Sequence, residues 1–280
     1  MNTITKEINE HYTQSNLSEK ILNSLQQAGK DVNALTRSDI IKFDEFHIRG
    51  SAATKELGQL ADIQPGEKLL DLGCGIGGAA RTLMTEFGAN VTGIDLVDEY
   101  ISTARALNEH IGYDGQITFE QADALDIPSL DNSFDVVFSQ HITMNIENKA
   151  QLAQEVRRVL RPGGRFVLYE ICAGAVDAPH LPVPWAGDQS INCLVEPEIL
   201  RQIFEESGFQ TTEWRDVTAM SLSWNQGLVT DMILPPIDGP ILLGQNLLMG
   251  DTAFLKLKNM MMNMQEDRIR VIQGVMISEL

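Results

Sequence analysis

Short apolar runs, bounded by glycine, proline and polar residues, recur along the chain from residue 68 onward. They predict seven β-strands, at 68–72, 90–94, 117–121, 134–140, 165–171, 210–217 and 268–277. Apolar residues at helical spacing predict intervening helices near 80–87, 98–111, 152–160 and 197–208. Strands that alternate with helices in this way predict an α/β fold, with a parallel sheet covered by helices on both faces.

The segment before the first strand differs in pattern from the rest. Residues 1–50 contain one helical stripe, around Leu17 to Leu25, and are too short and polar to fold alone. We expect an N-terminal helical lid across the mouth of the sheet, followed by a domain over 51–280 that starts with a helix at 52–61. Two substrate-side insertions are expected within this domain, near 174–197, which is rich in proline, and near 224–264, whose methionines are more typical of core.

The turn after the first strand carries the most chemical information. Gly73, Gly75 and Gly77 follow an apolar strand and precede a helix, so the backbone can turn sharply and approach a ligand closely. Asp95 ends the second strand, about twenty residues beyond Gly75, where a carboxylate can accept hydrogen bonds from both ribose hydroxyls. The pattern indicates an adenosine-containing cofactor.

Two kinds of cofactor fit such a turn. Gly73, Gly75 and Gly78 satisfy the dinucleotide pattern G-x-G-x-x-G, so an NAD(P)-dependent oxidoreductase must be considered. Asp71 separates the two, because a carboxylate at the end of the strand repels a pyrophosphate but suits the ammonium of a methionine moiety. This residue favours S-adenosyl-L-methionine.

Later segments extend the pattern in a fixed order. They are Ala122-Asp123-Ala124, Phe134-Asp135-Val136-Val137 and Leu160-Arg161-Pro162-Gly163-Gly164. Together with the glycine turn and Asp95, they resemble the class I S-adenosylmethionine-dependent methyltransferases. That resemblance implies a Rossmann-like sheet of seven strands, mostly parallel, with an antiparallel last strand.

A narrower resemblance covers most of the chain. It rests on His11-Tyr12, Asp44-Glu45-Phe46-His47, Gln140-His141, Met144-Asn145-Ile146 and Pro182-Val183-Pro184-Trp185. These segments are similar to a small-molecule subgroup that includes sarcosine/dimethylglycine N-methyltransferases and prenyl or phenolic C-methyltransferases.

The resemblance also implies the residues of the cofactor site. Gly73, Gly75 and Gly77 would pass beneath the methionyl and ribose portions, with Asp71 and Gln140 beside them and Asp95 on the ribose. Leu96 would face the adenine, Asp123 would accept from its amino group and Ala124 would supply a backbone amide. Arg81 and Tyr12 are weaker candidates for binding the cofactor carboxylate.

Methyl transfer from a sulfonium is an in-line displacement, so the protein must align the acceptor and, for some acceptors, remove a proton. The candidate catalytic bases are His141, Glu170 and His47, although each of them has a purely structural alternative. The candidate substrate-pocket residues are Tyr12, His180 and Trp185.

Composition narrows the class of partner. A net charge of −18 disfavours nucleic acid as a partner, because nucleic-acid binding depends on clustered Lys and Arg.

The polar N-terminus and the absence of a run of about twenty apolar residues predict a cytoplasmic protein without membrane contact. The three cysteines lack metal-ligand spacing, so we expect no metal. A homodimer through the lid or the C-terminal helices is possible.

The sequence therefore predicts methyl transfer to a small metabolite without a metal. N-methylation of an amino-acid-like amine is slightly favoured over C- or O-methylation of a prenyl, phenolic or other apolar molecule. An oxidoreductase and a non-catalytic protein that binds the cofactor remain as alternatives from other classes.

Overall fold

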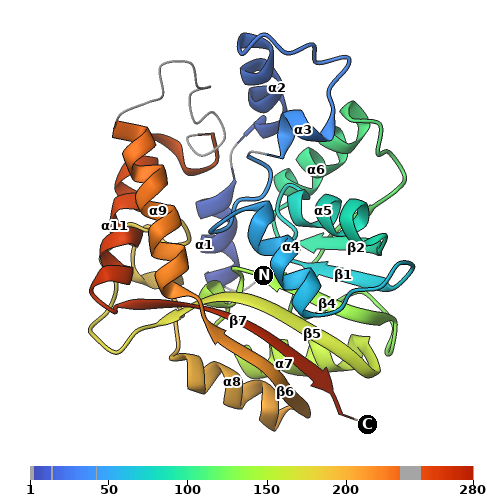
Figure 1. Cartoon of the computed structure of the whole chain (residues 1–280), viewed down its shortest axis with the longest axis vertical. Helices are drawn as coiled ribbons and strands as arrows, with labels where there is room; N and C mark the ends of the chain where they lie inside the picture. Colours follow the sequence, from blue (N-terminus) through green and yellow to red (C-terminus); the bar gives the residue numbers. More distant parts are fainter. Residues whose placement is uncertain (1–2, 14, 42, 234–246, 280) are drawn as a thin grey trace.

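The computed structural model describes residues 3–13, 15–41, 43–233 and 247–279. Part of the predicted insertion at 224–264, residues 234–246, therefore lies outside the described residues. Figure 1 shows a sheet with helices on both faces and a helical cap beside it.

Seven strands form one sheet, in the order β3-β2-β1-β4-β5-β7-β6. The bounds of the strands are β1 Lys68–Leu72, β2 Asn90–Asp95, β3 Thr118–Gln121, β4 Phe134–Gln140, β5 Leu160–Ala173, β6 Phe209–Asp216 and β7 Ile269–Ser278. The pairs among β1 to β5 are parallel, and β7 runs antiparallel to both β5 and β6. The predicted fold class is confirmed, including the antiparallel last strand.

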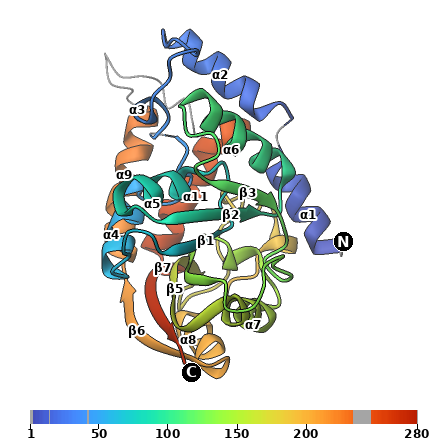
Figure 2. The ribbon, with the colours of Figure 1, turned by 90° about the vertical axis from the view of Figure 1, so that its right-hand side faces the viewer.

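Two apolar layers hold helices against the sheet (Figures 1 and 2). One face packs against α4 Ser51–Leu60, α5 Gly78–Phe87 and α6 Asp98–His110. The other packs against α7 Lys149–Val159 and α8 Pro197–Glu206. Burial on both faces explains why the central strands are continuous apolar runs rather than alternating ones.

The cap lies at the carboxyl ends of the parallel strands. It consists of α1 Thr3–Tyr12, α2 Leu17–Gln27, α3 Arg37–Ile40, α9 Thr218–Ile233 and α11 Ala253–Gln265, with short 3-10 turns at η1 Thr143–Asn145, η2 Gln189–Ile191 and η3 Gly250–Thr252. Figure 1 shows α9 and α11 side by side, and the two helices are in contact. The lid therefore contains α1 and α3 as well as the predicted stripe, and the described part of the predicted second insertion includes the end of α9 and most of α11.

The lid is packed tightly on the glycine-turn helix. A Cβ built on Gly78, the first residue of α5, would lie 2.1 Å from the backbone oxygen of Asp44. Only a glycine at this position lets the lid backbone approach the helix so closely. The last glycine of the G-x-G-x-x-G pattern, Gly78, is thus required by the packing of the lid on α5.

We expect Gly78→Ala to destabilise the protein by about 1–3 kcal/mol, because the new methyl group must push the lid away. Thermal unfolding checks this. Gly227→Ala is the matched control, because a Cβ at the exposed Gly227 of α9 meets nothing within 4 Å. That change is expected to be neutral or to stabilise by about 0.5–1 kcal/mol. Equal melting temperatures for the two variants would contradict the packing role.

Candidate functional site

A cavity of about 590 Å³ opens at the carboxyl ends of β1, β2 and β4. Its volume lies within the range of small-molecule sites, roughly 300–1,000 Å³. The strand ends contribute one side, the lid residues 43–51 cover it, and α9 and α11 contribute Trp224, Leu228, Leu257 and Met260. The cavity occupies the point where the strand order reverses, which is where ligands bind in open α/β sheets.

Each glycine of the turn has its own reason to be glycine. Gly73 and Gly75 line the cavity with φ of 77° and 53°, a region that side chains avoid. A Cβ on Gly73 would lie 2.1 Å from Ile142 Cγ2. Gly77 does not line the cavity; a Cβ there would lie 2.6 Å from the Phe119 ring, so this glycine serves the packing of α5.

Asp95 fastens the turn to the end of β2. Its two carboxylate oxygens accept hydrogen bonds from the backbone N–H groups of Gly75 and Val97, both at 2.9 Å. Burial raises the pKa of Asp95, and the backbone hydrogen bonds from Val97, Gly75 and Leu96 oppose the rise. A carboxylate has about four acceptor sites, so Asp95 can still accept from a ligand in the cavity that it lines.

Asp71 is a buried carboxyl group with an incomplete set of partners. Among the described residues its Oδ2 atom has no hydrogen-bond partner, and the residue lines the cavity. Burial, together with the negative charges of Glu45 and Asp95, raises the pKa of Asp71 to about 8, against a backbone hydrogen bond from Ala80. A cation placed beside Asp71 would relieve both effects.

Gln140 also offers an unused polar atom to the cavity. Its Oε1 atom lies 3.1 Å from the Thr54 hydroxyl, whereas its Nε2 atom has no partner in the described chain. A buried amide without a partner is rare in folded proteins. Asp71 and Gln140 together can therefore hold a ligand that carries both an ammonium and a carboxylate.

The end of the cavity beyond Asp95 is lined by Leu96, Asp123, Ala124 and Leu125. Asp123 Oδ1 accepts from the backbone N–H of Leu125 at 2.9 Å, which holds the loop after β3 in place. Leu96 supplies an apolar surface between two acidic residues. These residues can accommodate a flat, polar ring such as adenine.

A buried ionic cluster joins the lid to α5. Asp44 Oδ2 accepts from Arg37 Nη1 at 2.6 Å and from Arg81 Nη1 at 2.9 Å, and the side chains of Asp44 and Arg81 are fully buried. Arg81 donates three further hydrogen bonds, to Asn108 Oδ1 and to the backbone oxygens of Ile76 and Ala104. Arg81 is absent from the cavity wall, so it holds the lid instead of a cofactor carboxylate.

Glu45 continues this cluster toward the cavity. It accepts from the hydroxyls of Thr54 and Thr82, both at 2.5 Å, and lies 3.3 Å from His47 Nε2. Although burial alone raises the pKa of Glu45, hydrogen bonds from His47, Thr54 and Thr82 outweigh it, and the net pKa is lowered. Glu45 is thus an ionised carboxylate beside His47.

His141 has both ring nitrogens engaged. Nε2 accepts from the backbone N–H of Ile48 at 3.2 Å, and Nδ1 lies 2.9 Å from the backbone oxygen of Tyr169, so the proton resides on Nδ1. The ring is stacked on Tyr169. Burial lowers the pKa of His141 to about 3, with a further contribution from the charge of His47. His141 lines the cavity as a neutral ring that fixes the lid at Ile48.

His47 is differently placed. Its side chain is nearly buried and lines the cavity, with Nε2 facing Glu45 and Nδ1 3.3 Å from the Ile48 backbone oxygen. If Nε2 carries the proton that Glu45 accepts, the Nδ1 lone pair has no donor to bind in the described chain. His47 is the candidate base with a nitrogen left for chemistry.

Glu170 lies outside the cavity. Its carboxylate accepts from the Ser139 hydroxyl, from the backbone N–H groups of Ile142 and Thr143 and from the Thr143 hydroxyl, at 2.9–3.4 Å. Burial raises the pKa of Glu170 to about 7, against these hydrogen bonds. The arrangement makes Glu170 the anchor of the turn after β4 and not a wall of the site.

The predicted substrate-pocket residues separate in space. Tyr12 and Trp185 line the cavity, and Trp185 Nε1 donates to Asn192 Oδ1 at 2.9 Å. His180 lies outside it, with Nε2 2.8 Å from Glu266 Oε2 and a side chain 39% exposed. The site thus keeps Tyr12 and Trp185 and leaves out His180.

Asn145 was not among the predicted site residues. It accepts from the Tyr12 hydroxyl at 2.8 Å and donates to the backbone oxygens of Trp185 and Ile191, both at 2.9 Å. It therefore ties α1 and the loop near 185 to the turn after β4. The only signal in the sequence was its place in a segment of the family resemblance.

Within the described residues, no three His, Cys, Asp or Glu side chains are grouped so as to hold a metal ion. None of the described helices is long and apolar enough to cross a membrane.

Fold and site together define a Rossmann-like α/β protein with a small-molecule cavity at the switch point of its sheet. Residues 70–168 match the family model described as a methyltransferase domain. Over this segment the chain is similar to that family, and the resemblance to methyltransferases expected from the sequence is confirmed.

Among curated proteins, the chain is similar to the O-methyltransferase resE of Aspergillus sclerotiorum. The two are 30% identical over 59% of this chain and 62% of the relative, so the chain spans less than two thirds of the length of that relative.

Solved structures share the fold. Phosphoethanolamine N-methyltransferase 2 of Haemonchus contortus aligns with a TM-score of 0.73 and 19% identity, over 100% of this chain and 61% of the other. Geranyl diphosphate C-methyltransferase of Streptomyces coelicolor aligns with a TM-score of 0.68 and 16% identity, over 100% of this chain and 98% of the other. The three proteins carry names for O-, N- and C-methylation, so the likeness supports the fold without selecting an acceptor.

We expect Asp44→Ala to lower the free energy of unfolding by about 3–5 kcal/mol, because it leaves the buried Arg81 without its charge partner. Asp131→Ala is the matched control: it removes a surface pair with Arg158, with the Asp131 side chain 70% exposed, and should cost less than about 1 kcal/mol. Urea unfolding measures both. A similar small loss for the two would refute the anchoring role of Asp44.

Proposed function

We propose that this chain is an S-adenosylmethionine-dependent methyltransferase that acts on a small, largely apolar acceptor. The observation that carries the proposal is the buried carboxyl of Asp71 beside the glycine turn, whose Oδ2 atom has no partner among the described residues, together with the nearby carboxyl of Asp95. An ammonium beside Asp71 and a ribose beside Asp95 match these acids. A dinucleotide would instead bring a pyrophosphate against three carboxyl groups, those of Asp71, Asp95 and Glu45, which disfavours the oxidoreductase alternative.

The cofactor-side residues then have the roles expected from the sequence. Asp71 and Gln140 would hold the amino-acid end, Gly73 and Gly75 would allow close backbone approach, and Asp95 would accept from the ribose. Leu96, Asp123 and Ala124 would surround the adenine. When bound, S-adenosylmethionine supplies a methyl group already activated by its sulfonium.

The lining of the acceptor side of the cavity supports an apolar acceptor over an amino-acid-like amine. Trp224, Leu228, Leu257 and Met260 of the cap helices line it, together with Trp185. An apolar wall buries the body of an apolar molecule and offers little to a zwitterionic amino acid. We infer C- or O-methylation of an apolar compound ahead of N-methylation of an amino-acid-like amine.

His47 is the proposed base for acceptors that lose a proton. Glu45 holds the tautomer with the proton on Nε2, which leaves Nδ1 to accept the proton of the acceptor; the ionised Glu45 then stabilises the imidazolium. His141 is a positioning residue, since its hydrogen bond to Ile48 fixes the backbone beside His47. Glu170, likewise, holds the turn after β4.

The proposal also concerns the partners, the location and the oligomeric state of the protein. A net charge of −18 supports a small-molecule acceptor and not a nucleic acid. A cytoplasmic location and a homodimer stay predictions.

Calorimetric titration with S-adenosylmethionine tests the cofactor assignment. At pH 7 we expect binding to release close to one proton, because the pKa of Asp71 near 8 keeps it protonated until an ammonium lies beside it. Buffers of different ionisation enthalpy reveal the proton. Asp71→Asn should abolish the release and weaken binding about tenfold to a hundredfold, and Asp131→Asn should change neither. Binding of NADH but not S-adenosylmethionine would refute the proposal.

Incubation with methyl-labelled cofactor and a panel of phenols, prenyl compounds, carboxylic acids and amines then identifies the product by mass spectrometry. A labelled apolar compound is expected. A labelled amino acid would restore the amine class, and binding without any product would favour a non-catalytic protein.

With the identified acceptor, His47→Gln should lower kcat by about 10²–10⁴ and leave cofactor affinity nearly unchanged. His141→Gln should instead raise KM more than it lowers kcat, because it loosens the lid at Ile48. Steady-state kinetics with calorimetry separates the two effects. An unchanged kcat in His47→Gln would exclude His47 as the base.

A further inference from the structure

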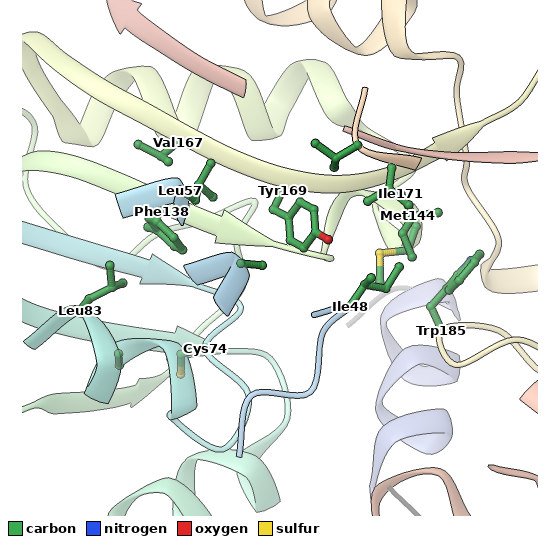
Figure 3. Close-up of a cluster of buried hydrophobic side chains, with 14 of the residues drawn as sticks. Ile48, Leu57, Cys74, Leu83, Phe138, Met144, Val167, Tyr169, Ile171 and Trp185 are labelled. Carbon is green, nitrogen blue, oxygen red and sulfur yellow. The ribbon is translucent and has the colours of Figure 1, made fainter. Parts of the chain in front are cut away.

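A group of buried polar side chains lies next to the cap helix α9, and the polar groups of these side chains have no role in the contacts described so far. Tyr169 and Gln273 are paired across β5 and β7, and Ser221 of α9 lies with its hydroxyl 3.4 Å from that of Tyr169. Asn225 follows Ser221 by one helical turn on the same side of α9, a helix that packs on β7. All four residues are fully buried. Figure 3 shows the Tyr169 ring between Val167 and Ile171 in the row of buried side chains along β5.

Two of these side chains lack every partner that their chemistry demands. Neither the amide nitrogen nor the amide oxygen of Asn225 has a hydrogen bond within the described chain, and the same is true of Gln273. Buried amides in folded proteins bond to protein, to ordered water or to ligand. Because α9 packs on β7 and neither amide has a partner among the described residues, we infer that polar atoms from outside the described residues occupy the space around them.

Arg49 connects this group with the cavity. It lines the cavity, and its charge and hydrogen bond lower the pKa of Tyr169 against burial, which is the larger effect and raises that pKa to about 12. Tyr169 therefore remains a hydrogen-bond donor at neutral pH.

The guanidinium of Arg49 is only partly satisfied. Nη2 lies 2.5 Å from Glu56 Oε2, whereas Nη1 is buried and has no hydrogen-bond partner among the described residues. Because Glu56 occupies one arm of the planar fork, the other arm is left to bind a second oxygen group. Guanidinium groups bind carboxylates through such an arm, and Tyr169 and the two amides add neutral donors beside it.

We propose that Arg49, which lines the cavity, and the buried Tyr169, Ser221, Asn225 and Gln273 behind it form a recess that binds the carboxylate of the methyl acceptor, which is an apolar carboxylic acid. The inference rests on the proposed function and narrows its acceptor class. Trp224 and Leu228, which flank Asn225 on α9, line the adjoining cavity and surround the apolar body of the same molecule.

Matched probes test the recess without any variant. The protein saturated with S-adenosylhomocysteine is titrated with cyclohexanecarboxylate, its uncharged carboxamide, cyclohexylmethylamine and cyclohexyl phosphate, followed by ligand-detected NMR. We expect the carboxylate to bind at least about tenfold more tightly than the carboxamide and the amine. Equal affinities, tighter binding of the amine or phosphate, or no binding of the carboxylate up to its solubility limit would overturn the inference.

Two variants locate the binding. Arg49→Met should reduce carboxylate affinity to the level of the carboxamide, and Arg201→Met, which removes an exposed guanidinium of α8, should not. Gln273→Leu should weaken carboxylate binding and raise the melting temperature of the free protein, because it removes an unpartnered buried amide. A lower melting temperature with unchanged carboxylate affinity would mean that ordered water fills the recess.

The experiments distinguish a wrong assignment of the recess as a carboxylate site from a wrong assignment of the function. Titration with S-adenosylhomocysteine alone comes first. No binding at that step counts against the methyltransferase assignment, whereas tight binding followed by indifference to the carboxylate counts against the recess alone.

Discussion

The buried ion pair between Asp44 and Arg81 is the contact on which the rest of the site depends. Arg81 belongs to the helix that follows the glycine turn, and Asp44 belongs to the lid, so the pair joins the two walls of the cavity. Burying charges is favourable only when their partners are complete, and Arg81 has four acceptors. The same segment of the lid then carries Glu45, His47 and Ile48 to fixed positions, so the position of the proposed base depends on this one ionic contact.

The cavity is divided by chemistry as well as by position. One end of it is acidic, and there burial and the charges of Glu45 and Asp95 raise the pKa of Asp71. The other end is apolar, with Trp224 and Met260 from the cap. A cationic cofactor and an apolar acceptor fit opposite ends of such a cavity, and each would be disfavoured at the wrong end. The acidic and apolar ends of the cavity would therefore orient the two ligands, without a separate protein group to position each ligand atom.

The sheet and the glycine turn could be predicted from the sequence because their signals are local. Strand length, the glycines of the turn and Asp95 at the end of a strand can each be recognised within a few residues. The roles of His141 and Glu170 were beyond such signals. His141 is occupied by Ile48, which lies 93 positions earlier in the chain. Glu170 sits on a strand buried on both faces, where the sequence cannot say which face a side chain takes. The helices α9 and α11 lacked a clear stripe for a related reason, since each contacts both the sheet and the other.

Methyl transfer from an activated donor requires little of the protein beyond alignment and the exclusion of water, and the rigid contacts are distributed accordingly. The parts that would hold the donor are fastened by backbone hydrogen bonds at Asp95 and by full burial at Arg81. The parts that would hold the acceptor come from cap helices, which lie apart from the glycine turn and can change without disturbing it. Such a separation explains how one fold accommodates relatives named for O-, N- and C-methylation. In this chain the acceptor chemistry is therefore to be sought where the cap leaves polar atoms unsatisfied, at Arg49 and the amides beside Tyr169.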